Sequence, residues 1–560
     1  SKAKTFTMCG ISGVFSNNED EANLLAVAGM SAVEAGPLSG PPVQLQNSAV
    51  ERTGTHPDVA LLRGMIDKID HRGPDGQGLF TDTAKGVALG HCRLAIMDPV
   101  GGAQPLYSED NGSVLVGNGE IYNYHHLRNR LDENHHFYTD TDNEAILHLV
   151  EEQGSKAVAQ LDGMYAFALY RNSGYDSKRF LLARDPVGIK PLYYATPMGE
   201  DAATGSSLFF ASELKAFAGS NLMVREFPPG TYYDSEHGFI TYYTVPQQQP
   251  VAASVEEIAT NVRRHLEAAV TKRLMSDVPL GAFLSGGLDS SLIAALVRQQ
   301  VDELHTFSVG IEGSNDIEAA RVVADHIGSI HHEYLYSAEE VLNRLPEIVY
   351  HLESFDQDLV RSAIPCYFCS RLAADYVKVI LTGEGADELF AGYTYYKGYD
   401  DLQLLHNELR RSVTALHNIN LQRVDRLTMA HGIEGRVPFL DTGLIAYAQT
   451  IDPALKLKPT STGRRIEKWI LRKACEDLLP SSIVWRDKEQ FDEGSGTVDL
   501  LGPLIERVTA TIDVAAYQKA HAQDRLRSAE ECYYHQLLSS HFERPRMILD
   551  NVARWSVEQS

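Results

Sequence analysis

An apolar run, a turn of small residues and an amphipathic run follow one another between Val278 and Leu296. The turn reads Ser-Gly-Gly-Leu-Asp-Ser-Ser at residues 285–291 and is called the SGGLDSS loop below. This order predicts a buried strand, a tight turn and the start of a helix. Backbone N–H groups at a helix N-terminus form an anion site, and glycines let a phosphate approach the backbone. The spacing differs from the common Gly-x-x-x-x-Gly-Lys-Ser/Thr phosphate loop, and an ordinary strand–turn–helix connection is the alternative at this point.

The second half of the chain repeats this alternation. From Val255 onward, helical patterns are separated by β-like runs at 306–310 and 377–381. Strands that alternate with helices predict an α/β architecture with a parallel sheet. Ligands of such sheets bind at the carboxyl ends of the strands. The SGGLDSS loop and the Thr-Gly-Glu-Gly-Ala-Asp-Glu segment at 382–388 both follow predicted strands, so both should line one cleft.

The first part of the chain has a different sequence pattern. Short strand-like runs with turn signals between them predict an α+β, β-sandwich-like domain layered with helices. These runs lie at 87–89, 113–116, 165–170, 180–183 and 208–210. Residues 246–254 predict a linker. Residues 17–66, without a steady period except near 59–69, predict a long and mobile insertion. We therefore expect two domains, at 9–240 and 255–545.

Composition excludes several classes of protein. A net charge of −25 argues against a nucleic-acid partner, which needs a basic face. No run of about 18 apolar residues and no secretory segment stands out, so we expect a cytoplasmic protein without a membrane partner. Six cysteines in 560 residues do not indicate a disulfide framework. Cys366-x-x-Cys369 has redox spacing but lies in an apolar stretch, which favours two buried thiols.

Cys9 and Gly10 open the first strand-like segment. A Cys at a chain start suggests an N-terminal nucleophile whose free α-amine serves as its base. A buried structural cysteine is the alternative. Together with the motifs that follow in order, this segment resembles the class II glutamine amidotransferase domain, an Ntn-hydrolase-type sandwich. Those motifs are His-Arg-Gly-Pro-Asp at 71–75, His-Cys-Arg-Leu-Ala-Ile-Met-Asp at 91–98, Asn-Gly-Glu-Ile-Tyr-Asn at 118–123, Thr-Asp-Asn-Glu at 141–144, Leu-Asp-Gly-Met-Tyr-Ala at 161–166 and Arg-Asp-Pro-Val-Gly-Ile-Lys-Pro-Leu at 184–192.

The resemblance implies a glutaminase site. Cys9 would attack the glutamine amide, while the Asn118 side chain and the Gly119 N–H would hold the oxyanion. One such donor is typically worth about 3 kcal/mol of barrier. Without its neighbours, Asn118-Gly119 would instead favour a type I′ turn. The further contacts to glutamine that the resemblance implies come from Arg93 on the α-carboxylate, Glu120 and Asp142 on the α-ammonium, and the backbone at Ile96.

Residues 1–8 bear on this chemistry, because an internal Cys9 has no free amine. We expect the mature protein to start at Cys9. If residues 1–8 are retained, the glutaminase would be silent.

Over nearly its full length, the chain resembles glutamine-dependent asparagine synthetase. The SGGLDSS loop is similar to the pyrophosphate loop of ATP pyrophosphatases, which cleave ATP to AMP and pyrophosphate. The other matching segments are 272–279, 306–310, 324–328, 382–388, 435–441 and 485–491. The resemblance implies that glutamine supplies ammonia, which crosses an interior tunnel to an acyl adenylate, and it suggests a homodimer.

The resemblance assigns roles in the synthetase half. Asp289 and Asp387 would supply carboxylates to Mg²⁺, which prefers oxygen ligands. Lys488 would stabilise the departing pyrophosphate, and Glu384 would be the base for ammonia. The contacts to ATP that it implies are those of Leu284, Ser285, Gly286, Gly287, Asp289, Ser290, Val309, Thr382 and Gly383.

The acceptor pocket departs from the family pattern. Arg361 is kept and could pair with a carboxylate of the acceptor. Asp358 and Leu359 stand where two threonines are usual, and a lost hydroxyl pair would change recognition. The acceptor is therefore aspartate or a related acid. The alternatives are a natural-product amide synthetase that takes another acid, and a catalytically silent binding or regulatory protein.

Overall fold

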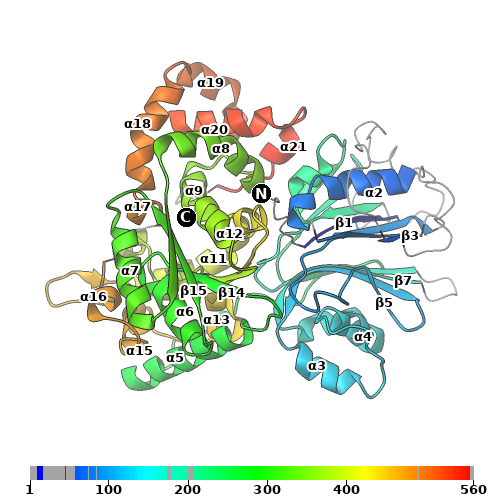
Figure 1. Ribbon diagram of the computed structural model, residues 1–560, viewed down its shortest axis with the longest axis horizontal. Helices are drawn as coiled ribbons and strands as arrows, with labels where there is room; N and C mark the ends of the chain where they lie inside the picture. The colour runs from blue at the N-terminus through cyan, green and yellow to red at the C-terminus, as the bar shows by residue number, and fades with distance from the viewer. Residues whose placement is uncertain are drawn as a thin grey trace. The chain divides into compact units, whose positions relative to one another are not determined.

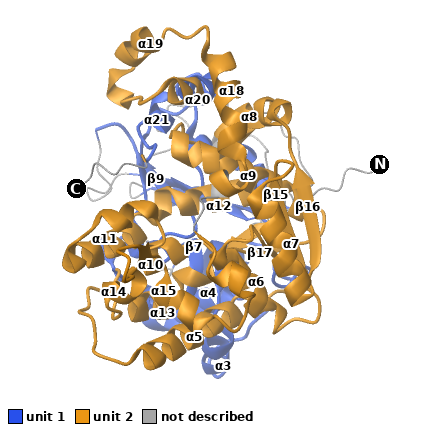
Figure 2. Cartoon of the chain, turned by 90° about the vertical axis from the view of Figure 1, so that its left-hand side faces the viewer, with its two compact units in different colours: residues 1–244, 429–432, 535–553 blue, residues 245–428, 433–534, 554–560 orange. Residues whose placement is uncertain are grey.

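The computed structural model describes residues 9–16, 44–45, 57–73, 75–82, 85–172, 178–199, 207–487 and 491–554 (Figure 1). The chain forms two compact units (Figure 2). Unit 1 comprises residues 1–244, 429–432 and 535–553, and unit 2 comprises residues 245–428, 433–534 and 554–560. The expected domain bounds, 9–240 and 255–545, stay a prediction.

Unit 1 is a sandwich of two sheets. The first sheet runs, in spatial order, β11 (Met223–Glu226), β9 (Tyr193–Thr196), β10 (Leu208–Ala211), β1 (Gly10–Phe15), β4 (Val87–Cys92), β3 (Gln77–Asp82) and β2 (Gln44–Leu45). The second runs β13 (Gly238–Thr241), β12 (Thr231–Asp234), β8 (Lys178–Arg184), β7 (Gly163–Asn172), β6 (Ser113–Ile121) and β5 (Leu106–Tyr107). Neighbouring strands pair antiparallel, except β2 with β3. The predicted sandwich is confirmed.

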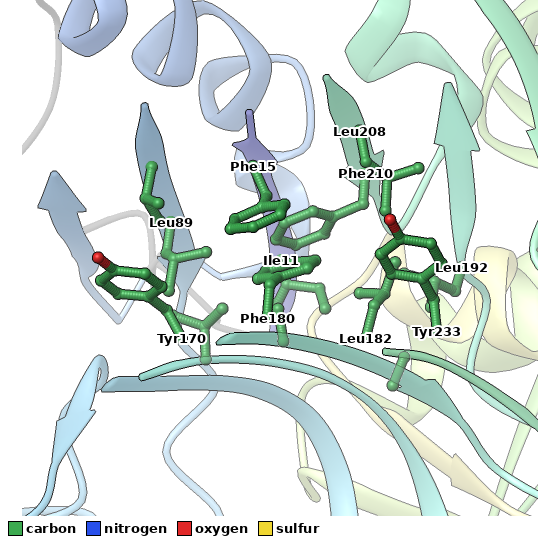
Figure 3. Close-up of a cluster of buried hydrophobic side chains, with 14 of the residues drawn as sticks. Ile11, Phe15, Leu89, Tyr170, Phe180, Leu182, Leu192, Leu208, Phe210 and Tyr233 are labelled. Carbon is green, nitrogen blue, oxygen red and sulfur yellow. The ribbon is translucent and has the colours of Figure 1, made fainter. Parts of the chain in front are cut away.

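The core of unit 1 lies between these sheets (Figure 3). Successive side chains of a strand point to opposite faces, so alternate residues of β1, Ile11 and Phe15, reach the same core. Phe15 stacks on Phe180 of the facing sheet, with ring centroids 4.8 Å apart. The alternation along β1 and β8 therefore sets which side chains of each strand face this core.

Helices cover the outer faces of this sandwich. Helix α2 (Pro57–Asp67) packs on β1 and β4, where Gly90 leaves room for Leu62 and Ile66. On the other sheet lie α3 (Tyr124–Leu131) and α4 (Glu144–Gln153) (Figure 1). The period near 59–69 thus marked a real helix inside the expected insertion, while residues 17–43 and 46–56 lie outside the described residues.

Unit 2 is built on a parallel sheet of five strands, which confirms the predicted α/β architecture. Its spatial order is β16 (Ile330–Leu335), β15 (His305–Gly310), β14 (Leu280–Phe283), β17 (Val379–Leu381) and β18 (Glu434–Arg436). The chain winds outward from β14 to β16 and then returns to β17 on the other side of β14. This reversal places a topological switch point beside β14, where doubly wound sheets bind their ligands.

Helices of unit 2 connect these strands and cover the sheet. Helix α6 packs against α7, and α8 packs against α9. Right-handed crossovers place the first pair on one face and the second pair on the other. The helices after residue 250 are α5 (Val255–Lys272), α6 (Leu288–Arg298), α7 (Asn315–Ile327), α8 (Ala338–Leu352), α9 (Gln357–Ala373), α10 (Ala386–Phe390), α11 (Leu402–Thr414), α12 (Asn420–Met429), α13 (Thr442–Ala448), α14 (Pro453–Lys456), α15 (Trp469–Ala474), α16 (Ser481–Val484), α17 (Phe491–Gly494), α18 (Thr497–Thr509), α19 (Val514–Ala520), α20 (Ala529–Ser540) and α21 (Arg546–Leu549).

Local sequence sets the start of several of these helices. Ser254 accepts a hydrogen bond from the backbone of Glu257 at the start of α5, and Ser337 does the same with Glu340 at the start of α8. Such caps satisfy N–H groups that have no partner inside the helix. Cys366 and Cys369 are free and buried in α9, which confirms the prediction of two buried thiols.

The predicted linker, 246–254, forms neither helix nor strand, yet it is anchored within unit 2. The Gln248 carbonyl accepts a hydrogen bond of 2.8 Å from His406, and the Val251 N–H donates to Thr450 at 2.9 Å. These two backbone hydrogen bonds hold the segment, so it is not a free tether. Among the described helices, none is long and apolar enough to cross a bilayer.

Lys456, at the end of α14, is a buried lysine whose ammonium makes no hydrogen bond to any described residue. Burial lowers the pKa of Lys456 to about 7, below its value of about 10.4 in an unfolded chain. Below pH 7 both states hold the proton, so the folded state carries the whole cost of a buried charge. That cost falls as the pH rises from 7 to about 10.4, because only the unfolded state is then protonated.

We predict that Lys456→Met raises the free energy of unfolding, and that the gain is roughly 2–3 kcal/mol larger at pH 6 than at pH 9. Urea titrations at the two pH values measure it. Lys473→Met, at a lysine that pairs with Glu476 at the surface, is the control and should show no such pH dependence. Equal gains at both pH values would contradict the prediction.

Candidate active sites

Unit 2 contains a cavity of about 390 Å³ at the carboxyl ends of β14, β15 and β17. The SGGLDSS loop follows β14 and the segment 382–388 follows β17, and both line this cavity, as their places after strands predict. The residues proposed from sequence that line it are Leu284, Ser285, Gly287, Asp289, Ser290, Thr382, Gly383, Glu384 and Asp387.

The SGGLDSS loop is held in shape by its own small side chains. The hydroxyls of Ser285 and Ser290 lie 3.0 Å apart, and the Gly287 N–H donates to Ser285 at 3.3 Å. Gly286 has φ = +76°, and a Cβ there would lie 2.5 Å from Ala319. A left-handed backbone in close contact requires glycine. The loop therefore presents the N-terminus of α6 toward the cavity without bulky side chains in the way.

Gly383 lets the two cavity segments touch. A Cβ at this position would lie 2.8 Å from the Asp289 Cβ and 2.9 Å from the backbone nitrogen of Ser290. The end of β17 thus packs directly on the first turn of α6. This contact fixes Asp289 relative to Asp387, four residues beyond Gly383.

Lys468 joins the two carboxylates that the sequence identified. Its Nζ lies 2.5 Å from Asp289 and 2.6 Å from Asp387, and its side chain is 2 % exposed. Lys468 caps α15 with φ = +54°, and its N–H donates to Phe390 at 3.1 Å. Sequence reasoning missed this residue, because no local motif marks it and 179 positions separate it from Asp289.

A second ion pair lies in the cavity wall, between Glu384 and Arg423 of α12. Burial lowers the pKa of the Arg423 guanidinium, but Glu384 outweighs this effect and the net shift is upward. Arg423 was also missed by sequence reasoning.

Behind this wall, Glu388 of α10 accepts a hydrogen bond of 2.6 Å from Tyr393. Burial, and then the charge of the neighbouring Asp387, raises the pKa of Glu388 to about 8. A carboxyl that is easily protonated at this depth limits the negative charge around Asp387.

The predicted acceptor residues separate in the structure. Asp358 and Leu359, at the start of α9, line the cavity, and Asp358 pairs with Arg527 at 3.3 Å. Arg361 is not among the lining residues. Its guanidinium bonds both carboxylate oxygens of Glu530, at 2.9 Å and 2.5 Å. Arg361 is only three positions from Asp358, yet its bonds to Glu530 draw its guanidinium away from the cavity lining, which spacing alone did not show.

Three further sequence-based assignments have different outcomes. Val309 is buried in β15 and does not line the cavity, whereas Phe307 and Ser308 of the same strand do. Gly286 supports the loop through its carbonyl, which accepts from Arg486 at 3.2 Å. Lys488 lies outside the described residues.

In unit 1, Cys9 stands at the start of β1 and is held against the segment after β4. Its Sγ accepts a hydrogen bond of 3.0 Å from the Leu94 N–H, and its carbonyl accepts from Arg72 at 3.2 Å. Arg72 in turn forms a buried pair of 2.7 Å with Glu213. The thiol is half-buried and lies beside the motif that contains Arg93.

Asn118 and Gly119 lie inside strand β6, paired with Ala166 and Tyr165 of β7, rather than in the turn that the dipeptide alone favours. Asn118 is fully buried, and neither atom of its side-chain amide has a hydrogen-bond partner among the described residues. Buried polar atoms are normally paired, so this amide is a candidate for binding a ligand. Gly119 has φ = +134°, and a Cβ there would overlap the Met164 carbonyl.

His91 of β4 supports this strand. Burial, and then the charge of Arg93, lowers the pKa of His91 to about 3, so the ring is neutral. Its Nε2 therefore donates to the Gly117 carbonyl at 3.1 Å, next to Asn118. A neutral imidazole fixes the strand without adding charge to the site.

The other proposed glutamine contacts are buried or tied down. Glu120 is 4 % exposed, and the Asp142 carboxylate accepts from the Ile121 N–H at 2.5 Å. Ile96 is buried. Arg93 is half-buried and donates to the Asp98 carbonyl at 2.6 Å and to the Pro99 carbonyl at 3.1 Å. These contacts join Arg93 to the turn after Ile96. They also join Asp142 to the end of β6.

An Ntn-hydrolase-type sandwich with a cysteine at its first strand, and a parallel sheet with a phosphate-type loop at its switch point, define a two-part amidotransferase. Comparison with known families agrees. Residues 48–273 match the glutamine amidotransferase domain, and residues 261–403 and 399–559 match asparagine synthase.

Relatives match over most of their length. Glutamine-hydrolyzing asparagine synthetase 2 of Arabidopsis thaliana is 41% identical over 445 residues, which cover 77% of this chain and 75% of that protein. The enzyme of the same name from Sandersonia aurantiaca is 38% identical over 492 residues, with 85% and 91% covered. That of Zea mays is 41% identical over 445 residues, with 77% and 74% covered. This chain belongs to the asparagine synthase family.

The contact at Gly383 yields a prediction. Gly383→Ala would force the SGGLDSS loop away from the end of β17, and a misplacement of about 1 Å costs roughly 100-fold in rate. We expect a drop of that order in ATP-dependent pyrophosphate release with little change in Tm. Gly502→Ala is the control, because a Cβ on that helix meets no atom within 4 Å. Unchanged pyrophosphate release in Gly383→Ala would contradict the prediction.

Proposed function

We propose that this protein converts aspartate to asparagine, with ATP as the energy source and ammonia taken from glutamine. Unit 1 hydrolyses glutamine, and unit 2 joins aspartate to AMP and releases pyrophosphate. The observation that carries the proposal is the cavity in which the SGGLDSS loop, Asp289, Asp387 and Lys468 converge. Membership of the asparagine synthase family supports it.

ATP would bind with its phosphates over the SGGLDSS loop, where the N–H groups at the start of α6 favour an anion. Leu284, Ser285, Gly287, Ser290, Thr382 and Gly383 would surround the nucleotide, with Gly286 shaping the loop and Val309 supporting β15 from within. Asp289 and Asp387 face each other across one ammonium group, and such an oxygen donor pair fits Mg²⁺. When bound, Mg²⁺ would neutralise phosphate charge.

Lys468 is the residue that we propose to hold charge on the leaving pyrophosphate. Its ammonium already lies at the loop, buried and fixed by the left-handed turn before α15. A fixed cation at the position where charge develops lowers a barrier without reorganisation. Lys488, for which the sequence suggested this role, remains a proposal beside it.

Glu384 is the proposed base that takes a proton from ammonia as nitrogen attacks the acyl carbon and AMP departs. Arg423 fixes the position of the carboxylate through their ion pair, and both residues line the cavity. A base must be within hydrogen-bond reach of its proton and in the deprotonated form. The place of Glu384 in the cavity wall, beside the loop where the adenylate would form, supports the first condition.

For glutamine hydrolysis, we propose that Cys9 attacks the side-chain amide once residues 1–8 are removed, with its own α-amine as base. The Asn118 amide and the Gly119 N–H would hold the oxyanion. The unpaired, buried amide of Asn118 supports this role, because its hydrogen-bonding capacity is kept for a ligand. Arg93, Ile96, Glu120 and Asp142 would bind the amino-acid end of glutamine.

A second candidate function, amidation of another acid, is favoured by the cavity wall. Asp358 and Leu359 line the cavity without the hydroxyls usual in the family, and Arg361 bonds Glu530 instead of lining it. An assignment of Arg361 to the acceptor would require it to leave this bidentate pair. We propose a homodimer on the resemblance and a cytoplasmic location on the composition, and light scattering tests the first.

The acceptor is tested by pyrophosphate release from ATP with ammonium and a panel of acids. We expect release with aspartate, at a rate at least about tenfold above that with glutamate, because one methylene is worth 1–3 kcal/mol in a fitted pocket. Release with other acids but not aspartate would support the second candidate. No release with any acid would leave a binding protein.

Cys9→Ala tests whether glutamine hydrolysis and amide formation occur in separate units. We expect the variant to lose glutamine-dependent asparagine formation and to keep the ammonium-dependent reaction within about twofold, because the oxyanion site and the nucleophile belong to unit 1 alone. Amino-acid analysis of the product measures both. Intact mass establishes the start of the active wild-type chain. Glutamine use by protein that retains residues 1–8 would contradict the proposed base.

A further inference from the structure

We propose that unit 1 binds one Zn²⁺ ion through His135, His148 and Glu151, away from the residues proposed for glutamine hydrolysis. His148 and Glu151 are three positions apart on α4, so both lie on one face of the helix. His135 comes from the segment after α3. This zinc site goes beyond the proposed function and does not rest on it.

The spacing of Glu151 and His148 already matches that of a tetrahedral zinc site, and the other spacings are longer. The Glu151 Oε2 lies 3.3 Å from Nδ1 of His148 and 3.8 Å from Nδ1 of His135. Zinc bonds of about 2.0–2.2 Å to nitrogen and oxygen place neighbouring ligand atoms about 3.3–3.5 Å apart. One donor atom of each residue lies within 4.8 Å of the others, so a single ion can reach all three with small side-chain shifts.

Both imidazoles also carry an outer carboxylate, as zinc-binding histidines usually do. The far nitrogen, Nε2, of His148 lies 3.5 Å from Glu144, and that of His135 lies 3.6 Å from Glu152. These outer carboxylates are themselves fixed, because Glu144 accepts from the Tyr138 N–H at 2.7 Å and Glu152 accepts from Asn134 at 2.9 Å. Each ring is therefore oriented with Nδ1 toward Glu151.

A fourth ligand is available in Glu109, whose carboxylate lies 3.7 Å from the same Nδ1 of His135. Ser113 donates to the other oxygen of Glu151 at 3.0 Å, which holds Oε2 toward the histidines. Two imidazoles with carboxylates suit Zn²⁺, whereas Mg²⁺ and Ca²⁺ prefer oxygen ligands alone.

Charge and burial favour a cation at this point. Four carboxylates, those of Glu109, Glu144, Glu151 and Glu152, contact two imidazoles. Even with both rings protonated and the nearby Arg171 counted, negative charge is in excess. The His148 side chain is 0 % exposed and that of His135 is 13 % exposed, so water screens little of this negative charge. Zn²⁺ would replace the proton that His148 shares with Glu151.

The ion would be structural. It would clamp the 132–138 segment and the β5–β6 turn onto α4. Helix α4 begins directly after Asn143, whose amide donates to the Gly119 carbonyl at 3.0 Å. A clamp on α4 therefore steadies the strand that carries Asn118.

The test is a Co²⁺ titration of the full chain with Mg²⁺ in excess, followed by visible absorption, because Co²⁺ in a tetrahedral zinc site absorbs strongly. We expect one equivalent to give this absorption and equimolar Zn²⁺ to remove it. His135→Asn and His148→Asn should abolish it, whereas His126→Gln, at an exposed histidine of α3, should keep it. Zn²⁺ should also raise the Tm of wild type but not of His148→Asn.

Absence of tetrahedral absorption in wild type would overturn the proposal, and so would its survival in both histidine variants. A near-ultraviolet thiolate band would place the ion on a cysteine and would also overturn it. If a histidine variant fails to fold, Glu151→Gln decides, because it removes a ligand charge with little change of shape. The absorption and Tm measurements do not require asparagine formation, so they test the zinc site whether or not the proposed function holds.

Discussion

The ammonium of Lys468 between Asp289 and Asp387 is the interaction on which the synthetase site depends. Two carboxylates from different strand ends would repel each other in a partly enclosed cavity, where charge is poorly screened. One ammonium, 2.5 Å and 2.6 Å from them, turns that repulsion into attraction from both sides. Gly392 makes the arrangement possible, because a Cβ there would overlap both Asp387 and Lys468. A buried ion pair of this kind fixes a specific geometry more than it adds stability.

The two candidate sites differ in how their polar groups are paired before any ligand binds. In unit 2, the charged groups of the cavity are already paired, as Lys468 with its two aspartates and Arg423 with Glu384. In unit 1, the Asn118 amide is buried without a hydrogen-bond partner among the described residues, inside a strand that Gly119 distorts. Paired charges can be exchanged for those of a nucleotide. An unpaired amide instead gains its partner when charge develops on a substrate, which is how an oxyanion site acts.

The periodicity of the sequence predicted the elements whose formation depends on neighbouring residues. The strand before the SGGLDSS loop, the alternation of strands and helices after residue 255 and the helix near 59–69 were all visible as periodicity. Lys468 and Arg423 were not, because their places depend on how distant helices return to the sheet. Arg361 shows the limit of motif spacing, since it is three positions from the cavity residue Asp358 but is bonded to Glu530 instead of lining the cavity. Asn118-Gly119 shows it again, because pairing with β7 overrides the turn preference of the dipeptide.

The charge balance of the cavity bears on what must enter with ATP. Among the described lining residues, Asp289, Asp316, Asp358, Glu384, Asp387 and Asp487 are acidic, while Arg423, Lys468, Arg472 and Arg486 are basic. The wall is therefore net negative by two charges before any substrate binds. A nucleotide with several negative charges, and an acidic acceptor beside it, would increase that imbalance. Arg472, already counted among the four basic residues, is bonded to Glu467 and to the carbonyls of Val484 and Arg486. A divalent cation entering with ATP, as proposed above, would offset the imbalance, and Asp289 and Asp387 are the carboxylates that would hold it.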